Sequence, residues 1–398
     1  MKDKKKWIKL RHGIVRNILY WTLGTYTKIK YNIKIDKFKG QEKRPYLVLF
    51  NHQTAFDQFF VGMSFRGPVY YLASEDLFSN GFVSSLIRYL AAPIPIKKQT
   101  TDVRAILNCM RVAKEGGTIA IAPEGNRTYS GRTEYMSPSI APLARKLGLP
   151  IALYRIEGGY GVHPRWSDSV RRGRMHSYVS EVISPEEYEG ISDDELFARI
   201  ERGLYVNEAV VDGEYKSKTG AEYLERAMYV CPFHGLSRFE SSGDTIRCLE
   251  CGRRVRYGST KELFGEDFDF PFSFVSEWYD HQSDYINSLD TRKLTKTAIY
   301  TDTADLYEVI PYKKKILIEK GVKLSLYGDR LVVGDCVYGF GSVSAITVLG
   351  RNKLNMYFDG KIYQFKSDKR FCALKYVQIF NRHKNILKGD ENATFLGL

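Results

Sequence analysis

The chain has 398 residues, 43% of them hydrophobic, and a formal net charge of +14, so it is long enough for two or three domains of ~150 residues with buried cores. The excess of positive charge favours a polyanionic partner, either nucleic acid or an anionic membrane surface. The absence of any long apolar run excludes a membrane-spanning helix, and six cysteines are too few for a disulfide scaffold.

Residues 1–28 join a basic stretch to an amphipathic pattern, in which apolar side chains recur at three- and four-residue steps. These side chains are Trp7, Leu10, Ile14, Ile18 and Trp21. Such a pattern predicts a helix that lies in a membrane interface, and the alternative is a core helix with a solvated basic tail. Polar residues interrupt the pattern, so we predict no signal peptide. We expect a cytoplasmic protein that is peripheral on the inner face of the membrane.

Residues 29–211 alternate between strand-like and helical patterns. The strand-like runs are Tyr46–Phe50, Val69–Leu72, Ile94–Ile96, Thr118–Ala122, Ile151–Ile156 and Met175–Val182. The helical patterns are Leu77–Leu90, Val103–Lys114, Ile140–Leu147 and residues 185–209. This alternation predicts an α/β domain with a mostly parallel sheet flanked by helices.

The first polar motif, residues 51–57, follows the strand-like run at 46–50. His52 can act as a general base at neutral pH, and Asp57 can hold its tautomer. His163 and Asp168 have the same spacing, but they lie in a glycine-rich segment, so one of the two matches is accidental. The motif contains no serine or cysteine placed as a nucleophile. We therefore expect His52 to activate a substrate hydroxyl that attacks an acyl donor.

The second motif, Ala122-Pro123-Glu124-Gly125-Asn126-Arg127, ends the strand-like run at 118–122. Arg127 can bind a phosphate through two parallel hydrogen bonds, and Gly125 allows close backbone approach or a tight turn. Glu124 can orient the arginine or bind a substrate hydroxyl. The alternative is a surface turn that carries a Glu–Arg ion pair. Both motifs follow strands at the edge where open α/β sheets bind ligands.

In this order the two motifs resemble the glycerolipid acyltransferase family, whose best-known members are the 1-acyl-glycerol-3-phosphate acyltransferases. That family pairs an Asn-His-x4-Asp block with a Pro-Glu-Gly-Thr-Arg block, and Asn126 replaces the usual threonine. Residues 73–78 and 147–151 are similar to two further family blocks, so the resemblance covers roughly residues 15–210. The family usually has an arginine where this chain has Lys97 and Lys98.

The resemblance implies an O-acyltransferase that moves a fatty acyl group from acyl-CoA or acyl carrier protein to a lysophospholipid hydroxyl. The leading acceptor is 1-acyl-glycerol-3-phosphate. His52 and Asp57 would be catalytic. The implied substrate-binding residues are Asn51, Lys97, Lys98, Glu124, Gly125, Asn126 and Arg127. The alternative is a catalytically inactive scaffold whose C-terminal parts bind nucleic acid or protein.

A polar segment at 212–220 reads as a linker to a cysteine-containing region. There Cys231-x2-His234 and Cys248-x2-Cys251 give two ligand pairs at the spacing of a zinc site. We therefore predict a zinc ribbon over residues 222–260. Four protein ligands would leave no position for water, so the zinc would be structural. Nearby arginines leave nucleic-acid binding open as a second role for this region.

Residues 300–398 change to short strand-like runs separated by turn signals, followed by a helical pattern at Phe371–Arg382. The runs are Ile316–Leu326, Arg330–Val333, Ala345–Leu349, Leu354–Phe358 and Ile362–Phe365. Strands closed by one helix resemble a pleckstrin-homology-like module in topology. We therefore predict a mainly-β C-terminal module.

Overall fold

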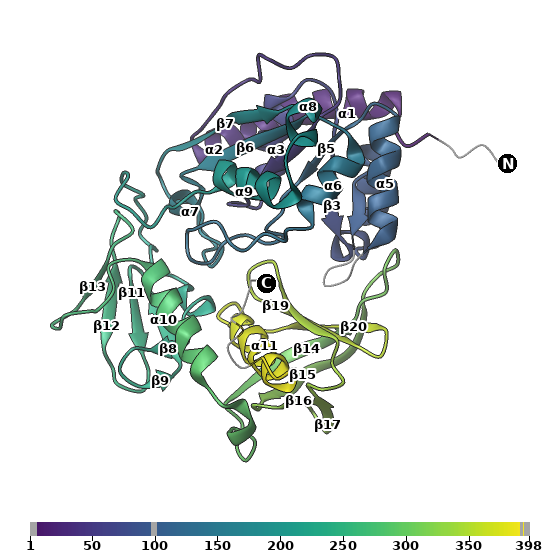
Figure 1. Ribbon diagram of the computed structural model, residues 1–398. Coiled ribbons are helices and arrows are strands. Elements are labelled where there is room, and N and C mark those ends of the chain that lie inside the picture. The colour runs from purple at the N-terminus through teal and green to yellow at the C-terminus, as the bar shows by residue number, and fades with distance from the viewer. Residues whose placement is uncertain (1–5, 97–101, 391–392, 394–398) are drawn as a thin grey trace.

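The computed structural model describes residues 6–96, 102–390 and 393. The N-terminal α/β part lies at the top of Figure 1, coloured purple to teal, and the two β-rich parts, green and yellow, lie below it. Within the described ranges, no helix has the length and apolar character needed to cross a membrane.

The α/β part is built on a seven-stranded sheet of order β1-β7-β6-β2-β5-β3-β4. Its strands are β1 (Ile33–Ile35), β2 (Leu47–Phe50), β3 (Val69–Ser74), β4 (Ile94–Ile96), β5 (Thr118–Ile121), β6 (Ile151–Glu157) and β7 (Met175–Ile183). Every neighbouring pair is parallel except β6 and β7. The prediction of a mostly parallel sheet is confirmed.

Strand β2 lies at the centre and is buried on both faces, which explains its unbroken apolar sequence. Leu47 and Leu49 join a core with the helices on one face of the sheet. Val48 and Phe50 join a second core with the helices on the opposite face. β2 pairs in parallel with both β5 and β6. Because these three strands run in the same direction, the segments that follow them meet at one edge of the sheet.

The helices of the α/β part cover both faces of the sheet and connect its strands. They are α1 (Leu10–Leu19), α2 (Thr25–Tyr31), α3 (Asp57–Ser64), α4 (Phe82–Ala91), α5 (Val103–Lys114), α6 (Ile140–Leu147), α7 (Gly159–Val162), α8 (Pro185–Glu189) and α9 (Asp193–Leu204). The single N-terminal helix expected from the sequence is interrupted by a π-helical turn at Tyr20–Gly24. At this turn Gly24 packs so closely on Met63 that a Cβ would clash with its sulfur.

Two further helices differ from expectation. The helix expected from Leu77 begins only at Phe82, because Gly81 takes a left-handed φ of +59° that no regular helix accommodates. The helix expected over 185–209 is two helices. The second has its own capping box, in which Ser192 and Glu195 each bind the backbone N–H of the other residue.

The first β-rich part contains a small hairpin, a four-stranded antiparallel sheet and a helix that the sequence analysis missed. Its elements are β8 (Val230–Cys231), β9 (Gly235–Leu236), β10 (Phe239–Ser242), β11 (Thr245–Cys248), β12 (Arg254–Tyr257), β13 (Leu263–Gly265) and α10 (Val275–Ser288). The expected linker at 212–220 packs on the α/β part: Tyr215 is buried there, in contact with Gly161 and Gly173.

The C-terminal module is a seven-stranded antiparallel sheet of order β17-β16-β15-β14-β20-β19-β18, followed by α11 (Leu374–Leu387). Its strands are β14 (Tyr300–Glu308), β15 (Ile316–Leu326), β16 (Arg330–Val333), β17 (Cys336–Gly339), β18 (Ala345–Leu349), β19 (Lys353–Phe358) and β20 (Lys361–Lys366). The prediction of a mainly-β module closed by a helix is confirmed. Its pleckstrin-homology-like character stays a prediction.

One hydrophobic core joins the β-rich parts to the α/β part. This core runs from the first β-rich part into the C-terminal module, and it includes Tyr129 and Trp166 of the α/β part. Tyr129 Oη also donates to the carbonyl oxygen of Arg351 at 3.2 Å. The loops beyond β5 and β6 are therefore in direct contact with the C-terminal module.

Candidate active site

His52 and Asp57 form a hydrogen-bonded pair just beyond the end of β2. The distance between His52 Nδ1 and Asp57 Oδ2 is 2.7 Å, and the side chain of His52 is 26% exposed whereas that of Asp57 is fully buried. Because a carboxylate only accepts hydrogen bonds, this contact places the imidazole proton on Nδ1. The second nitrogen, Nε2, is then free to accept a proton.

The chain around Asp57 holds its carboxylate in place. Asp57 is the first residue of α3, where the helix dipole favours negative charge. Its oxygens accept hydrogen bonds from the backbone N–H groups of Gln53 and Thr54 at 2.8 and 2.9 Å, and from Thr54 Oγ1 at 2.7 Å. These donors hold the carboxylate beside the imidazole, where it can stabilise a positively charged imidazolium.

Asn51 ties the end of β2 to the end of β6. Its amide nitrogen donates to the carbonyl oxygen of Ile156, and its amide oxygen accepts from the N–H of the same residue, both at 2.8 Å. The side chain is fully buried. The Asn51 side chain thus takes the place of a neighbouring strand's backbone as the partner of Ile156. It fixes the point at which the chain leaves the sheet just before His52.

Glu124 joins the two motifs. One carboxylate oxygen accepts from the backbone N–H of His52 at 2.7 Å, and the other accepts from the N–H of Glu134 at 2.8 Å. Burial raises the pKa of Glu124 to about 8, although both hydrogen bonds act in the opposite direction. Both oxygens are engaged by main-chain donors, so this geometry fixes the backbone at His52. Contact between Glu124 and a substrate hydroxyl stays a prediction.

The rest of the second motif forms a turn with a buried cation. Gly125 adopts a φ of +68°, a left-handed conformation that glycine takes at little cost, and Asn126 is buried beside it. Arg127 is 8% exposed, and its Nη1 makes no hydrogen bond to any residue in the described ranges. An unpaired buried N–H group of this kind is suited to an anionic oxygen.

Two further arginines raise the positive charge around Arg127. Burial, and then the charges of Arg165 and Arg351, lower the pKa of Arg127 to about 10, so it is still charged at neutral pH. Arg165 donates through Nη1 to the Arg127 carbonyl oxygen at 2.8 Å and through Nε to that of Gly350 at 3.0 Å. Gly350 and Arg351 belong to the turn between β18 and β19, so the C-terminal module contributes to this cluster.

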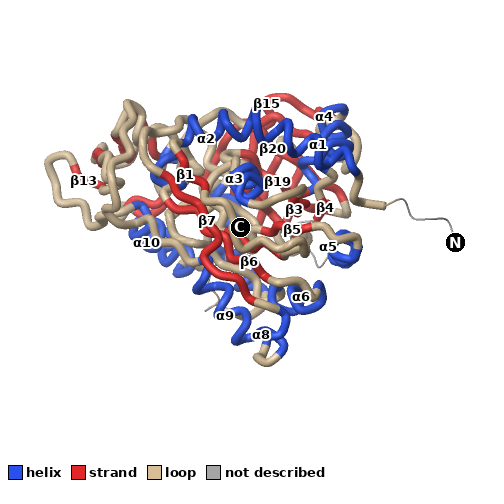
Figure 2. The backbone as a smooth tube through the Cα atoms, turned by 90° about the horizontal axis from the view of Figure 1, so that it is seen from above, coloured by secondary structure: helices blue, strands red, loops and turns tan. Residues whose placement is uncertain are grey.

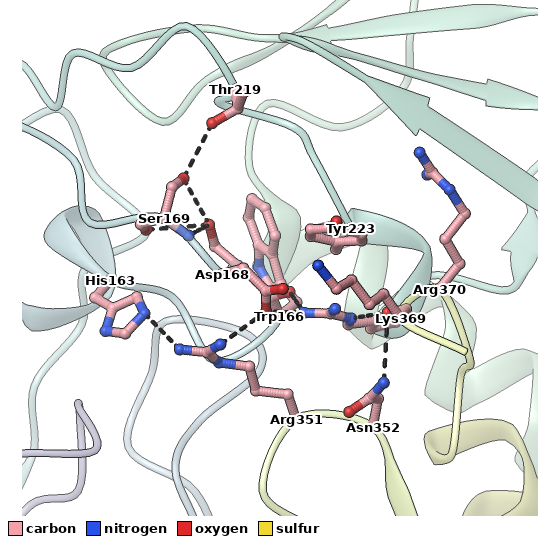
Figure 3. Close-up of polar contacts among 12 residues, drawn as sticks. His163, Trp166, Asp168, Ser169, Thr219, Tyr223, Arg351, Asn352, Lys369 and Arg370 are labelled. Carbon is pink, nitrogen blue, oxygen red and sulfur yellow. Dashed lines mark hydrogen bonds and ion pairs between the residues drawn. The ribbon is translucent and has the colours of Figure 1, made fainter. Parts of the chain in front are cut away.

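The second His-x4-Asp match has a different role. The ring nitrogens of His163 bind Tyr31 Oη at 2.9 Å and Arg351 Nη2 at 3.0 Å, while Asp168 Oδ1 binds Arg351 and Arg226, each at 2.7 Å. Figure 3 shows Arg351 between His163 and Asp168. Burial and nearby cations lower the pKa of His163 to about 3. With both nitrogens occupied, His163 is an anchor for Arg351, and the pattern match is accidental.

The structure brings together most of the residues expected at the site. Asn51, His52, Asp57, Glu124, Gly125, Asn126 and Arg127 lie in the loops that follow β2 and β5. Lys97 and Lys98 lie outside the described residues, so their placement stays a prediction. The sequence analysis missed Thr54, Arg165 and Arg351. Only Thr54 had a local signal, because a threonine just before a helix commonly bonds to nearby backbone N–H groups, as Thr54 Oγ1 does by accepting from the N–H of Phe56.

The expected metal ligands also gather. One ligand atom from each of Cys231, His234 and Cys251 lies within 4.8 Å of the others. Cys248 is not part of this group, but it is buried at the end of β11, three residues before Cys251. Three thiols and an imidazole on two hairpin turns fit the donor set of a tetrahedral zinc site.

Part of the chain is similar to known proteins. Residues 32–156 match the family model described as Acyltransferase, which supports assigning this part of the chain to that family. A solved structure of the 1-acyl-sn-glycerophosphate acyltransferase PlsC from Thermotoga maritima is similar over 48% of this chain and 78% of that one, with 22% identity and a TM-score of 0.40. A comparison with curated proteins gives no match.

Proposed function

We propose that this protein is an O-acyltransferase that transfers a fatty acyl group from an acyl thioester to the hydroxyl of a lysophospholipid. The observation that carries the proposal is the His52–Asp57 pair in the part of the chain that matches the Acyltransferase family model, with Arg127 Nη1 in the adjacent loop unpaired among the described residues. We propose 1-acyl-glycerol-3-phosphate as the acceptor, because its phosphate suits a cluster of three arginines. The donor is acyl-CoA or acyl carrier protein.

In the proposed reaction, His52 Nε2 takes the proton from the acceptor hydroxyl as its oxygen attacks the thioester carbonyl carbon. The new C–O bond forms and the C–S bond breaks. The thiolate leaves with the proton that His52 holds. Asp57 stabilises the imidazolium between these steps, and it keeps the Nδ1 proton in place for the next cycle.

The phosphate of the acceptor would bind at Arg127. Its free Nη1 supplies the donor, and Arg165 and Arg351 add positive charge without occupying that nitrogen. Lys97 and Lys98 are proposed to assist. Asn51 and Glu124 would position His52. Glu124 accepts from the backbone N–H of His52, and Asn51 donates to the carbonyl oxygen of Ile156 in β6.

The test measures thiol release from acyl-CoA and from acyl carrier protein with the full chain and lysophosphatidic acid in mixed micelles. His52→Ala should remove nearly all release, whereas His281→Ala, on α10, should retain it. Release that persists in His52→Ala would exclude the mechanism. Absence of release with both donors and several lysolipids would contradict the proposal and favour the catalytically inactive scaffold. Binding of nucleic acid or protein should then be measured.

We also propose that the cluster of Cys231, His234, Cys248 and Cys251 holds a structural zinc ion. The supporting observation is the gathering of three of these ligand atoms within 4.8 Å. When bound, zinc would join the β8–β9 turn to the loop between β11 and β12. Four protein ligands leave no open position, so no step of the acyl transfer is assigned to it.

A further inference from the structure

Helix α1 presents apolar side chains to solvent. Leu10 is 94% exposed, and Ile14, Ile18 and Trp21 are also exposed along the same helix and the turn that follows it. Arg11 attaches this helix to α4: its Nε donates to the Tyr89 carbonyl oxygen at 2.8 Å. This part of the apolar surface was expected from the sequence.

Helix α4 continues the surface. Phe82 is 81% exposed, and Val83, Leu86 and Tyr89 on the same helix are exposed as well. These four residues recur at steps of one, three and three, which places them on adjoining faces of the helix. The side of α4 that does not pack on the protein is therefore apolar, like the exposed side of α1.

A third segment, more than 200 residues away in sequence, lies beside α4. It is the tip of the β14–β15 hairpin, where Tyr312, Ile316, Leu317 and Ile318 are exposed. A β-bridge joins Lys314 to Asn80, just before α4. The rings of Tyr312 and Phe78 lie 5.8 Å apart, and the Arg88 guanidinium lies 5.5 Å from the Tyr312 ring.

These contacts place the three segments along one edge of the molecule. Figure 2 shows α2, β15, α1 and α4 together at the top of the view. We call the exposed apolar residues of α1, α4 and the hairpin tip the apolar edge. Monomeric proteins rarely leave contiguous apolar surface of this kind in water, and an exposed hydrophobic strand is an aggregation hazard unless something covers it.

Charge indicates what covers the apolar edge. The segments 6–31, 82–91 and 310–320 contain eleven lysines or arginines and one acidic residue, Glu319. Among the cations, Lys28, Lys30, Arg88, Lys313 and Lys314 are exposed. An apolar face bordered by cations complements an anionic lipid surface, where apolar side chains enter the interface and lysines meet the headgroups.

We propose that the β14–β15 hairpin of the C-terminal module inserts Ile316, Leu317 and Ile318 into the same anionic bilayer that α1 and α4 contact. The C-terminal module is then a second membrane contact, fixed to the first by the Asn80–Lys314 bridge. This inference goes beyond the proposed acyl transfer. It requires only lipid binding, so it can fail or succeed independently of catalysis.

The test measures partition of the full chain onto vesicles of phosphatidylcholine with phosphatidylglycerol, and onto phosphatidylcholine alone, in the absence of acyl donor. The variant is Ile316→Ser/Leu317→Ser/Ile318→Ser. Its control removes three other exposed apolar side chains, by Val210→Ser/Val211→Ser/Val337→Ser. All six positions are exposed, so we expect both variants to fold, which circular dichroism and a thermal melt verify.

We expect the hairpin variant to lose about tenfold or more in partition onto the anionic vesicles, since each apolar side chain contributes when it leaves water. The control should bind like the native chain. Lys313→Glu/Lys314→Glu should weaken binding to the anionic vesicles more than binding to phosphatidylcholine alone. Equal binding by the hairpin variant and the native chain would overturn the proposal. A native dimer that becomes monomeric in the hairpin variant would also overturn it, because a second copy would then cover the apolar edge.

Discussion

Arg351 of the C-terminal module donates through Nη2 to Nε2 of His163 in the α/β part at 3.0 Å. The same guanidinium binds Asp168 through Nη1 at 2.7 Å. Since Arg351 also lies close enough to Arg127 to lower its pKa, one side chain links the C-terminal module to the proposed phosphate site. Through this link the C-terminal module would influence the proposed activity of the α/β part.

Arg351→Ala should therefore weaken acceptor binding. The substitution removes one partner each from His163 and Asp168, which keep Tyr31 and Arg226, and it releases the β18–β19 turn that holds Arg165. Loss of a charge-assisted contact costs about 1.5–3 kcal/mol, so we expect KM for the lysophospholipid to rise about tenfold or more, with KM for the thioester unchanged. Steady-state kinetics with each substrate varied in turn provide the measurement.

The control is Lys361→Ala, which removes an exposed cation at the opposite end of β19 and β20. It should leave both KM values unchanged. An equal rise in both KM values for Arg351→Ala would indicate general loss of structure. No change in either value would mean that Arg351 does not position the acceptor site.

Asp57→Asn should reduce kcat and leave the fold intact. The asparagine is nearly isosteric, but an amide nitrogen at the position of Oδ2 would replace the acceptor of His52 Nδ1 and of the N–H groups of Gln53 and Thr54. The imidazole then loses its fixed tautomer and its counter-charge. General-base catalysis contributes roughly 10²–10⁴-fold, and we expect a loss of kcat in this range.

A thermal melt of Asp57→Asn serves as its control, because a large loss of stability would make the kinetics uninterpretable. Gln58→Asn changes the next residue, whose side chain donates to the carbonyl oxygen of Ala55 and is not part of the pair. It should retain near-native kcat. Full activity in Asp57→Asn would show that the histidine needs no partner.

The sequence predicted the pair and its setting because the relevant signals are local. Runs such as Tyr46–Phe50 and Thr118–Ala122 mark strands, and parallel strands bring the residues that follow them to one edge. Arg351 had no such signal, because its position depends on how a module some 200 residues away packs on Tyr129 and Trp166. Long-range packing of this kind leaves no periodicity in the chain.

Some of the errors were also local, and their causes are visible. Gly81 ends the helical conformation before α4 by its left-handed φ, although its neighbours fit a helical pattern. The capping box of Ser192 and Glu195 marks the start of a new helix. The prediction of one helix over residues 185–209 did not take this signal into account. By contrast, Asp359-Gly360 is one of the turn signals between the strand-like runs, and it lies in the hairpin between β19 and β20, where both residues take positive φ.

Removal of zinc should destabilise the first β-rich part. Its sheet is small, so a metal bridge between two turns would supply a large share of its stability. We expect one zinc ion per chain by mass spectrometry, and loss of this zinc together with a fall of several degrees in Tm for Cys251→Ser. Cys336→Ser, at an exposed cysteine outside the cluster, should keep both values. A metal-free native chain with an unchanged Tm in chelator would exclude the site.

Acid should destabilise the contact between the C-terminal module and the α/β part through His163. In the fold its Nε2 accepts from Arg351, so Nδ1 carries the proton that Tyr31 Oη receives, and the ring is neutral. The cations that face it are Arg127, Arg351, Lys30 and Arg171, and together with burial they lower its pKa to about 3. In the unfolded chain the pKa of histidine is about 6.5.

Between pH 6.5 and 3 the unfolded state therefore binds more protons at this residue than the folded state does. The stability from neutral His163 is complete above pH 6.5 and is lost as the pH falls toward 3, by about 1.4 kcal/mol per pH unit at most. Urea unfolding at pH 7 and pH 5 should show a smaller loss in His163→Gln than in the native chain, by about 2 kcal/mol. Equal losses in the two chains would mean that His163 becomes protonated without cost. The buried carboxyls, Glu124 above all, titrate in both chains, so the comparison isolates the histidine.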